Sequence, residues 1–60
     1  MRHTEINYKV GNKVYKDVVQ ELKGWESHYL QNVLNRIESI TDSETADGKH
    51  PVIVSIYQHN

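Results

Sequence analysis

The first segment of the chain alternates between apolar and polar positions. In the run 4–10 (TEINYKV) every second residue is apolar, namely Ile6, Tyr8 and Val10. A period of two is typical of a strand that buries one face. Gly11-Asn12 follows directly, and glycine suits the first central position of a type II′ hairpin turn, which needs a positive φ. The pattern predicts a strand and a tight turn.

The segment after this turn fits two periods. As a strand, residues 13–22 present no face that is wholly apolar. At about 100° per residue, their apolar side chains instead fall on one side of a helix. Asp17-Val18-Val19-Gln20 also resembles a capping box, with an acceptor at the N-cap and a glutamine three residues later. We therefore expect a short return strand over about 13–16 and a helix from near Asp17 to near Ile40.

Two alternatives remain open for residues 13–22. The return strand can run to Leu22, with the helix starting at Trp25. Otherwise Asn12 caps a helix at once, which gives a βααβ order.

The last third of the chain contains a polar loop and a strand. Residues 41–50 (TDSETADGKH) show no buried-face pattern and predict a flexible acidic loop. Residues 52–58 (VIVSIYQ) form the most β-prone segment, with two largely apolar faces. The chain is thus expected to form a single α+β domain over residues 1–60, in ββαβ order. Its three-stranded antiparallel sheet would have the order 2-1-3, with one helix on one face.

Composition limits how this small domain can be stabilised. Sixty residues bury only about 60% of the surface of the unfolded chain. The chain has no cysteine, which excludes disulfides and thiolate metal sites and fits a reducing compartment. A second copy of the chain is then the most accessible source of further buried surface.

No segment has the character of a membrane helix or a secretion signal. The longest apolar run, Val52–Val54, is far shorter than the ~20 residues that a membrane helix needs. Residues 1–5 carry no apolar core for a leader. We expect a cytoplasmic protein that does not contact membranes.

Catalytic and cofactor-binding motifs are also missing from the sequence. It contains no nucleophile elbow, no phosphate-binding glycine loop and no cysteine nucleophile. The four histidines lack the local spacing of a metal site; they are His3, His28, His50 and His59. We expect no cofactor, no metal and no enzymatic activity.

The C-terminal strand is the strongest candidate for an interface. A single helix covers one face of the sheet. If Val52, Val54 and Ile56 point inward, Ile53 and Tyr57 point outward, and the reverse assignment leaves three apolar residues outside. This strand would also be an edge strand without a lysine to discourage pairing. We expect a homodimer through the C-terminal strand or the uncovered sheet face, or a host protein bound there. The candidate interface residues are Ile53, Ser55, Tyr57, Trp25 and Tyr29.

Nucleic acid is the alternative partner. Basic and aromatic residues of the predicted hairpin could contact phosphates and stack on bases; they are Lys9, Lys13, Tyr15 and Lys16. Seven basic and eight acidic residues give a net charge of −1, whereas nucleic-acid-binding domains are usually basic. A weak nucleic-acid-binding or regulatory domain is therefore the second hypothesis.

In length, lack of cysteine and ββαβ order, the chain resembles the dimeric phage inhibitors of uracil-DNA glycosylase. The shared local feature is Lys23-Gly24 ahead of an aromatic-containing helix. Those inhibitors are distinctly acidic and this chain is not. The resemblance implies a binding protein, and we expect a small module, of phage or mobile-element type, that binds and modulates a host protein.

Overall fold

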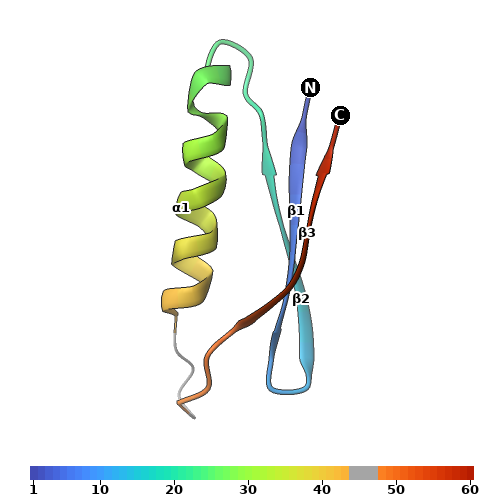
Figure 1. Cartoon of the computed structure of the whole chain (residues 1–60), viewed down its shortest axis with the longest axis vertical. Coiled ribbons are helices and arrows are strands. Elements are labelled where there is room, and N and C mark those ends of the chain that lie inside the picture. Colours follow the sequence, from blue (N-terminus) through green and yellow to red (C-terminus); the bar gives the residue numbers. More distant parts are fainter. Residues whose placement is uncertain (44–47) are drawn as a thin grey trace.

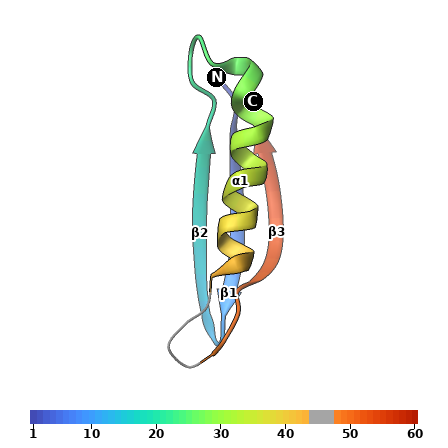
Figure 2. The ribbon, with the colours of Figure 1, turned by 90° about the vertical axis from the view of Figure 1, so that its left-hand side faces the viewer.

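The chain folds as a three-stranded antiparallel sheet with one long helix on one face. The computed structural model describes residues 1–43 and 48–60. The elements are β1 (His3–Val10), β2 (Lys13–Gln20), the 3-10 helix η1 (Glu26–His28), α1 (Tyr29–Asp42) and β3 (Val52–His59). The strand order is β2-β1-β3, and β1 is antiparallel to both neighbours. Helix α1 runs along the sheet in front of β1 (Figures 1 and 2). The predicted α+β fold and its sheet order are confirmed.

The N-terminal hairpin forms as its sequence predicts. Strands β1 and β2 pair over their full length, from Val10 opposite Lys13 to His3 opposite Gln20. Gly11 has a φ of 62°, and no non-glycine residue has a positive φ among those described. A positive φ at the first central residue alone is the pattern of a type II′ turn.

The expected helix from Asp17 is wrong. Strand β2 runs to Gln20, and α1 begins only at Tyr29, after the single turn of η1. The arrangement is closest to the alternative in which the return strand runs towards Leu22. Val19 is buried, whereas Val14 and Val18 are exposed on the other face of the strand. Apolar residues on both faces of β2 therefore gave the sequence a spacing like that of a helix. The hydrogen-bonded pairing with β1 stabilises this segment as a strand.

The connection from β2 to α1 depends on Gly24. Its φ of 87° lies in the left-handed region, which glycine adopts without steric penalty. The Gly24 amide donates to the carboxylate of Glu26 at 2.7 Å, and the Trp25 amide donates to the Leu22 carbonyl. Gly24 therefore forms part of a tight turn between β2 and η1.

Strand β3 contains a β-bulge that changes which side chains face α1. Asn7 pairs with Ser55, but its neighbour Tyr8 pairs with Ile53, so Val54 has no partner on β1. Ile53 consequently packs against the core under α1. The expected outward direction of Ile53 is wrong, because simple alternation holds only without an extra residue.

The core is small and lies between α1 and the sheet. Ile6, on the central strand, is the only large side chain described that is fully buried. Four other apolar residues are buried around it, and they are Val19, Tyr29, Val33 and Ile40. The Cα atoms extend over 40 × 17 × 11 Å, so the molecule is a narrow slab.

Helix α1 ends at Asp42, two residues into the predicted loop. The side chain and the amide of Ser43 both donate to the Ile40 carbonyl, which closes the last turn. The expected flexibility of 41–50 involves residues 44–47, which lie outside the described residues. In the described segments, no helix is long and apolar enough to cross a membrane.

Candidate functional site

The sheet face opposite α1 carries a polar network at its centre. The Asn7 amide donates to Glu5 at 3.1 Å and to the Ser55 hydroxyl at 3.3 Å. Lys16 lies 3.6 Å from the other Glu5 oxygen. The hydrogen bond from Asn7 lowers the pKa of Glu5, and Lys16 adds to this effect. A chain of polar groups thus crosses all three strands, so this face does not present a continuous apolar surface.

Aromatic rings gather at one end of the same face. The rings of His3 and His59 stack with their centroids 4.7 Å apart, and Tyr57 lies 6.4 Å from His59. Figure 1 shows that both chain ends lie at the same end of the sheet. The stacking of His3 on His59 joins β1 to β3.

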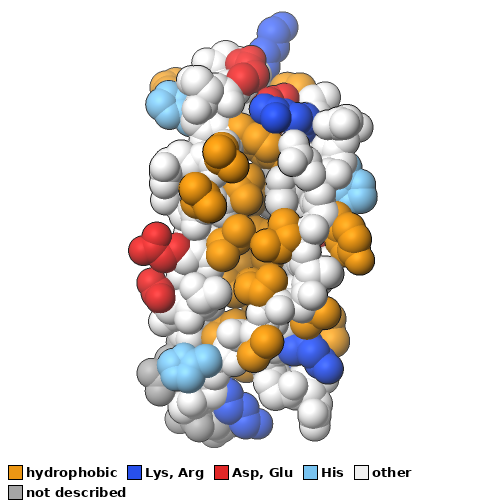
Figure 3. All heavy atoms as spheres, in the orientation of Figure 1, with side chains coloured by type: hydrophobic (Ala, Val, Ile, Leu, Met, Phe, Trp, Pro, Cys, Tyr) orange, Lys and Arg blue, Asp and Glu red, His pale blue; other side chains and the backbone are white. Residues whose placement is uncertain are grey.

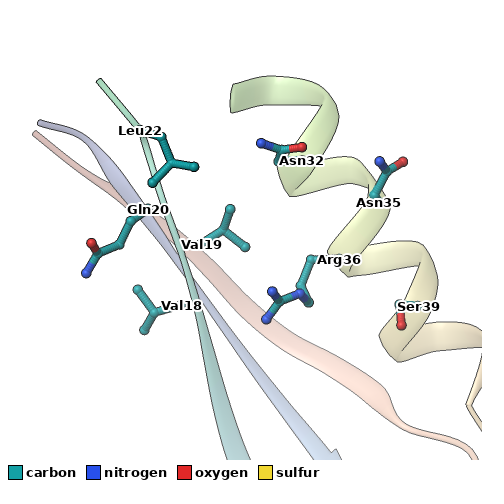
Figure 4. Close-up of a pocket in the computed structure, with 8 residues that line it drawn as sticks. All are labelled: Val18, Val19, Gln20, Leu22, Asn32, Asn35, Arg36 and Ser39. Carbon is teal, nitrogen blue, oxygen red and sulfur yellow. The ribbon is translucent and has the colours of Figure 1, made fainter. Parts of the chain in front are cut away.

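A cleft of about 530 Å3 lies between α1 and β2, and Val18, Val19 and Leu22 form part of its lining on the β2 side. Val19 points toward the helix and Gln20 points away from it (Figure 4). Arg36 donates to Asp17 on β2 at 3.0 Å. The helix side of the cleft is lined by Asn32, Asn35, Arg36 and Ser39. Amides and an ion pair make this side of α1 hydrophilic.

The opposite side of α1 is apolar. A groove of about 400 Å3 runs between α1 and β3. Leu30, Val33 and Ile56 form its apolar part, and its remaining lining includes the polar side chains of Arg2, Thr4, Glu26, Ser27 and Gln58. Leu30 and Leu34 are four residues apart, so they lie on the same side of the helix. Apolar side chains follow this junction in Figure 3. We refer to Leu30, Leu34 and Ile56, which are 68%, 50% and 47% exposed, as the apolar seam.

The two edge strands of the sheet differ in charge. Strand β2 carries Lys13, Lys16 and Asp17, and such side chains discourage pairing with another strand. Strand β3 (VIVSIYQH) has no lysine, arginine, aspartate or glutamate. The bulge residue Val54 is also exposed. The edge strand without charged side chains therefore lies beside the apolar seam.

The five predicted interface residues do not form one surface. Ser55 and Tyr57 lie on the open sheet face, whereas Ile53 lies under α1. Tyr29 is buried, where its hydroxyl contacts Thr4 Oγ1 at 2.5 Å. Trp25 is exposed in the turn that joins β2 to η1 and α1, and the centroid of its ring lies 5.4 Å from that of His28.

The residues proposed for nucleic-acid contact are also divided. Lys9 and Lys16 lie on the open face, and Lys16 is near Glu5. Tyr15 stacks on Tyr8 on the α1 side, and Lys13 shares that side by alternation. The structure does not bring these basic and aromatic groups together.

Metal-binding chemistry finds no support in the part of the chain that the structure describes. Within residues 1–43 and 48–60, no group of three or more histidines or carboxylates could hold a metal ion. His3 and His59 come together, but as a stacked pair.

Sequence reasoning missed the apolar seam. Leu30 and Leu34 belong to the apolar stripe of the helix that was expected from near Asp17 to near Ile40, and that stripe was expected to pack on the sheet. The width of that stripe was the available signal. A helix above the central strand buries only the middle of so wide an apolar face, and the side chains at its margin stay exposed.

Comparisons of the chain with protein families, curated proteins and solved structures give no match. The function must be argued from the surface itself.

Proposed function

We propose that this chain is a non-enzymatic protein-binding module that receives an extended segment of a partner at the β3 edge. The observation that carries the proposal is the uncharged edge of β3 beside the apolar seam. In strand addition, main-chain hydrogen bonds supply affinity and adjacent pockets take alternate side chains. The β3 edge and the α1–β3 groove offer these two elements side by side.

The other surfaces support this choice by contrast. The open sheet face is crossed by the polar network around Asn7, and the helix side of the α1–β2 cleft carries amides and the guanidinium of Arg36. Interfaces that bind specifically have an apolar centre depleted of charge. A host protein remains the proposed partner, as the sequence suggests.

The experiment uses a synthetic peptide of alternating valine and threonine with a lysine at each end. Backbone amide signals of the 15N-labelled chain are followed during titration. We expect shifts at residues 52–59 and along the α1 side of the groove. Leu30→Glu should weaken binding about tenfold or more, because burying a leucine is worth about 1.5–3 kcal/mol.

Two controls define the result. A peptide N-methylated at alternate amides cannot donate to β3, so it should not bind. Val14→Glu changes a residue on β2 that is 67% exposed, almost the same as Leu30, and should leave binding unchanged. Equal binding of the methylated peptide, or shifts confined to β2, would overturn the proposal.

A further inference from the structure

We infer that the strand that occupies the β3 edge is β3 of a second copy of this chain. The inference rests on the proposed function, since it names a polypeptide that the same surface binds. Two copies would pair their β3 strands antiparallel and form a continuous six-stranded sheet. A partner that presents an extended segment would then compete with self-association.

Strand β3 is complementary to itself in charge. Because β3 carries no lysine, arginine, aspartate or glutamate, two antiparallel β3 strands bring no like charges of these side chains together. A twofold axis perpendicular to the sheet keeps both helices on the same face. Residues directly opposite in a sheet share a face, so the axis lies midway between the two copies of one residue.

The groove indicates which residue lies at this axis. Ile56 lines it together with Leu30 and Val33, so these residues lie at the same level of the molecule. A register centred on Ile56 places the two copies of Ile56 opposite each other beneath the helices. It also brings Leu30 of each helix toward Leu34 of the other, because the two helices run antiparallel.

The distance between the two helices in this arrangement leaves room for the side chains of the apolar seam. Helix α1 lies in front of β1 (Figure 2), so the two helices would be three strand spacings apart. At about 4.8 Å per spacing, this separation is about 14 Å. Packed helices are usually 8–10 Å apart, so side chains must fill the remaining space. Leu30 and Leu34 project from both sides into this space, above Ile56.

The size of the core supports a second copy as the occupant. Five apolar residues are buried among those described, and only Ile6 is fully enclosed. Domains of this length usually need a disulfide, a metal or a partner subunit. The cysteine-free chain has no disulfide, and pairing at β3 would enlarge its core by three residues per copy.

The experiment is sedimentation equilibrium of the wild-type chain at micromolar and sub-millimolar concentrations. We expect a mass twice the 7.0 kDa of the chain. The double variant Leu30→Glu, Leu34→Glu should return to 7.0 kDa, because four carboxylates would meet in the shared core. The matched control Val14→Glu, Val18→Glu adds the same charge to the open face and should keep the doubled mass.

A charge-exchange experiment tests the contact itself. The variant Leu30→Lys, Leu34→Lys should also have the mass of one chain. An equimolar mixture with the glutamate variant should restore the doubled mass, because the contact now joins opposite charges. If the charged variants unfold by circular dichroism, Leu30→Gln with Leu34→Gln replaces them.

The outcomes separate this inference from the proposed function. A wild-type mass of 7.0 kDa throughout overturns the dimer, while peptide-induced shifts at β3 still support strand addition. A doubled mass that survives the seam variants, or is lost only in the open-face control, also overturns the inference. If the peptide does not bind and the doubled mass survives the seam variants, both proposals are overturned.

Discussion

Thr4 and Tyr29 form a buried polar contact that joins β1 to α1. Their hydroxyl groups lie 2.5 Å apart, and both residues are almost inaccessible to solvent. A buried hydroxyl that loses its partner destabilises a protein by about 1–3 kcal/mol. This contact fixes the height of the helix above the central strand.

We predict that Tyr29→Phe lowers the free energy of unfolding by about 1–3 kcal/mol, because the Thr4 hydroxyl loses its partner. Adding Thr4→Val removes the orphaned hydroxyl and should recover most of the loss. Urea denaturation of the two single variants and the double variant measures both effects. Additive losses in the double variant would contradict this account.

Arg2 and Glu21 close the end of the hairpin. Nε and Nη2 of Arg2 donate to one Glu21 oxygen at 2.9 and 2.6 Å, and the Arg2 amide donates to the other. The guanidinium also lies 4.7 Å from the centre of the Tyr29 ring. The side-chain hydrogen bonds from Arg2 lower the pKa of Glu21 below its ordinary value of 4.5.

We predict that Glu21 makes stability depend on pH below 4.5. Because folding lowers the pKa of Glu21, the unfolded chain binds the proton more readily. The contribution of Glu21 is therefore fully present above the ordinary pKa and is lost as the pH falls through the folded value. Glu21→Gln should lower Tm at pH 7, and its difference from the wild type should shrink in acid.

Thermal unfolding followed by circular dichroism across this pH range checks the prediction. Glu38→Gln, on the outer side of α1, is the matched control and should follow the wild type. A difference between Glu21→Gln and the wild type that persists in acid would count against the ion pair.

At the scale of elements, the bulge in β3 is the feature that simple alternation does not anticipate. Since Val54 has no partner on β1, the ladder on either side of it keeps its own register. We predict that deleting Val54 leaves Ile53 opposite Tyr8 and Ser55 opposite Asn7. The deletion variant should fold cooperatively, with Tm within a few degrees of the wild type.

Deletion of Tyr57 is the control for this experiment. Tyr57 lies in the regular part of the ladder, opposite Glu5, so its loss moves the following residues to the other face. This variant should unfold at a much lower temperature. Similar melting of both deletion variants would contradict the register described here.

The sequence predicted those elements whose pattern has one explanation. Alternation in 4–10 and the glycine at position 11 predicted β1 and its turn, and β-branched residues predicted β3. Strand β2 was harder to predict, because its valines occupy both faces and mimic a helical stripe. The pairing of β2 with β1 makes this segment a strand, and that pairing is a contact between separate segments of the chain.

The candidate site was less predictable than the fold. The unprotected C-terminal edge follows from composition, but the seam depends on where α1 lies relative to β3. The bulge also has no local sequence signal, so the direction of Ile53 could not be derived. Leu30 is exposed because it lies on the β3 side of α1, and its residue type alone would have placed it in the core.

At the scale of the whole molecule, stability and association are coupled. A 60-residue chain is expected to have a net stability of roughly 3–9 kcal/mol. We predict that the urea midpoint of the wild type rises with protein concentration. A hundredfold increase should add up to about 2.7 kcal/mol, because only the folded chain pairs.

The double variant Leu30→Glu, Leu34→Glu should show one midpoint at all concentrations. Circular dichroism in short and long path-length cells makes the comparison practical. A wild-type midpoint that does not move would be inconsistent with pairing of folded chains.

The stacked rings of His3 and His59 show that the two ends of the fold meet. A short linker can therefore join them without disturbing a strand, and the chain can be reopened between Gly11 and Asn12. Such a circular permutant would begin with β2 and would place β3 directly before β1. By the same geometry, the fold could be inserted into a surface loop of another protein with both connections at one end.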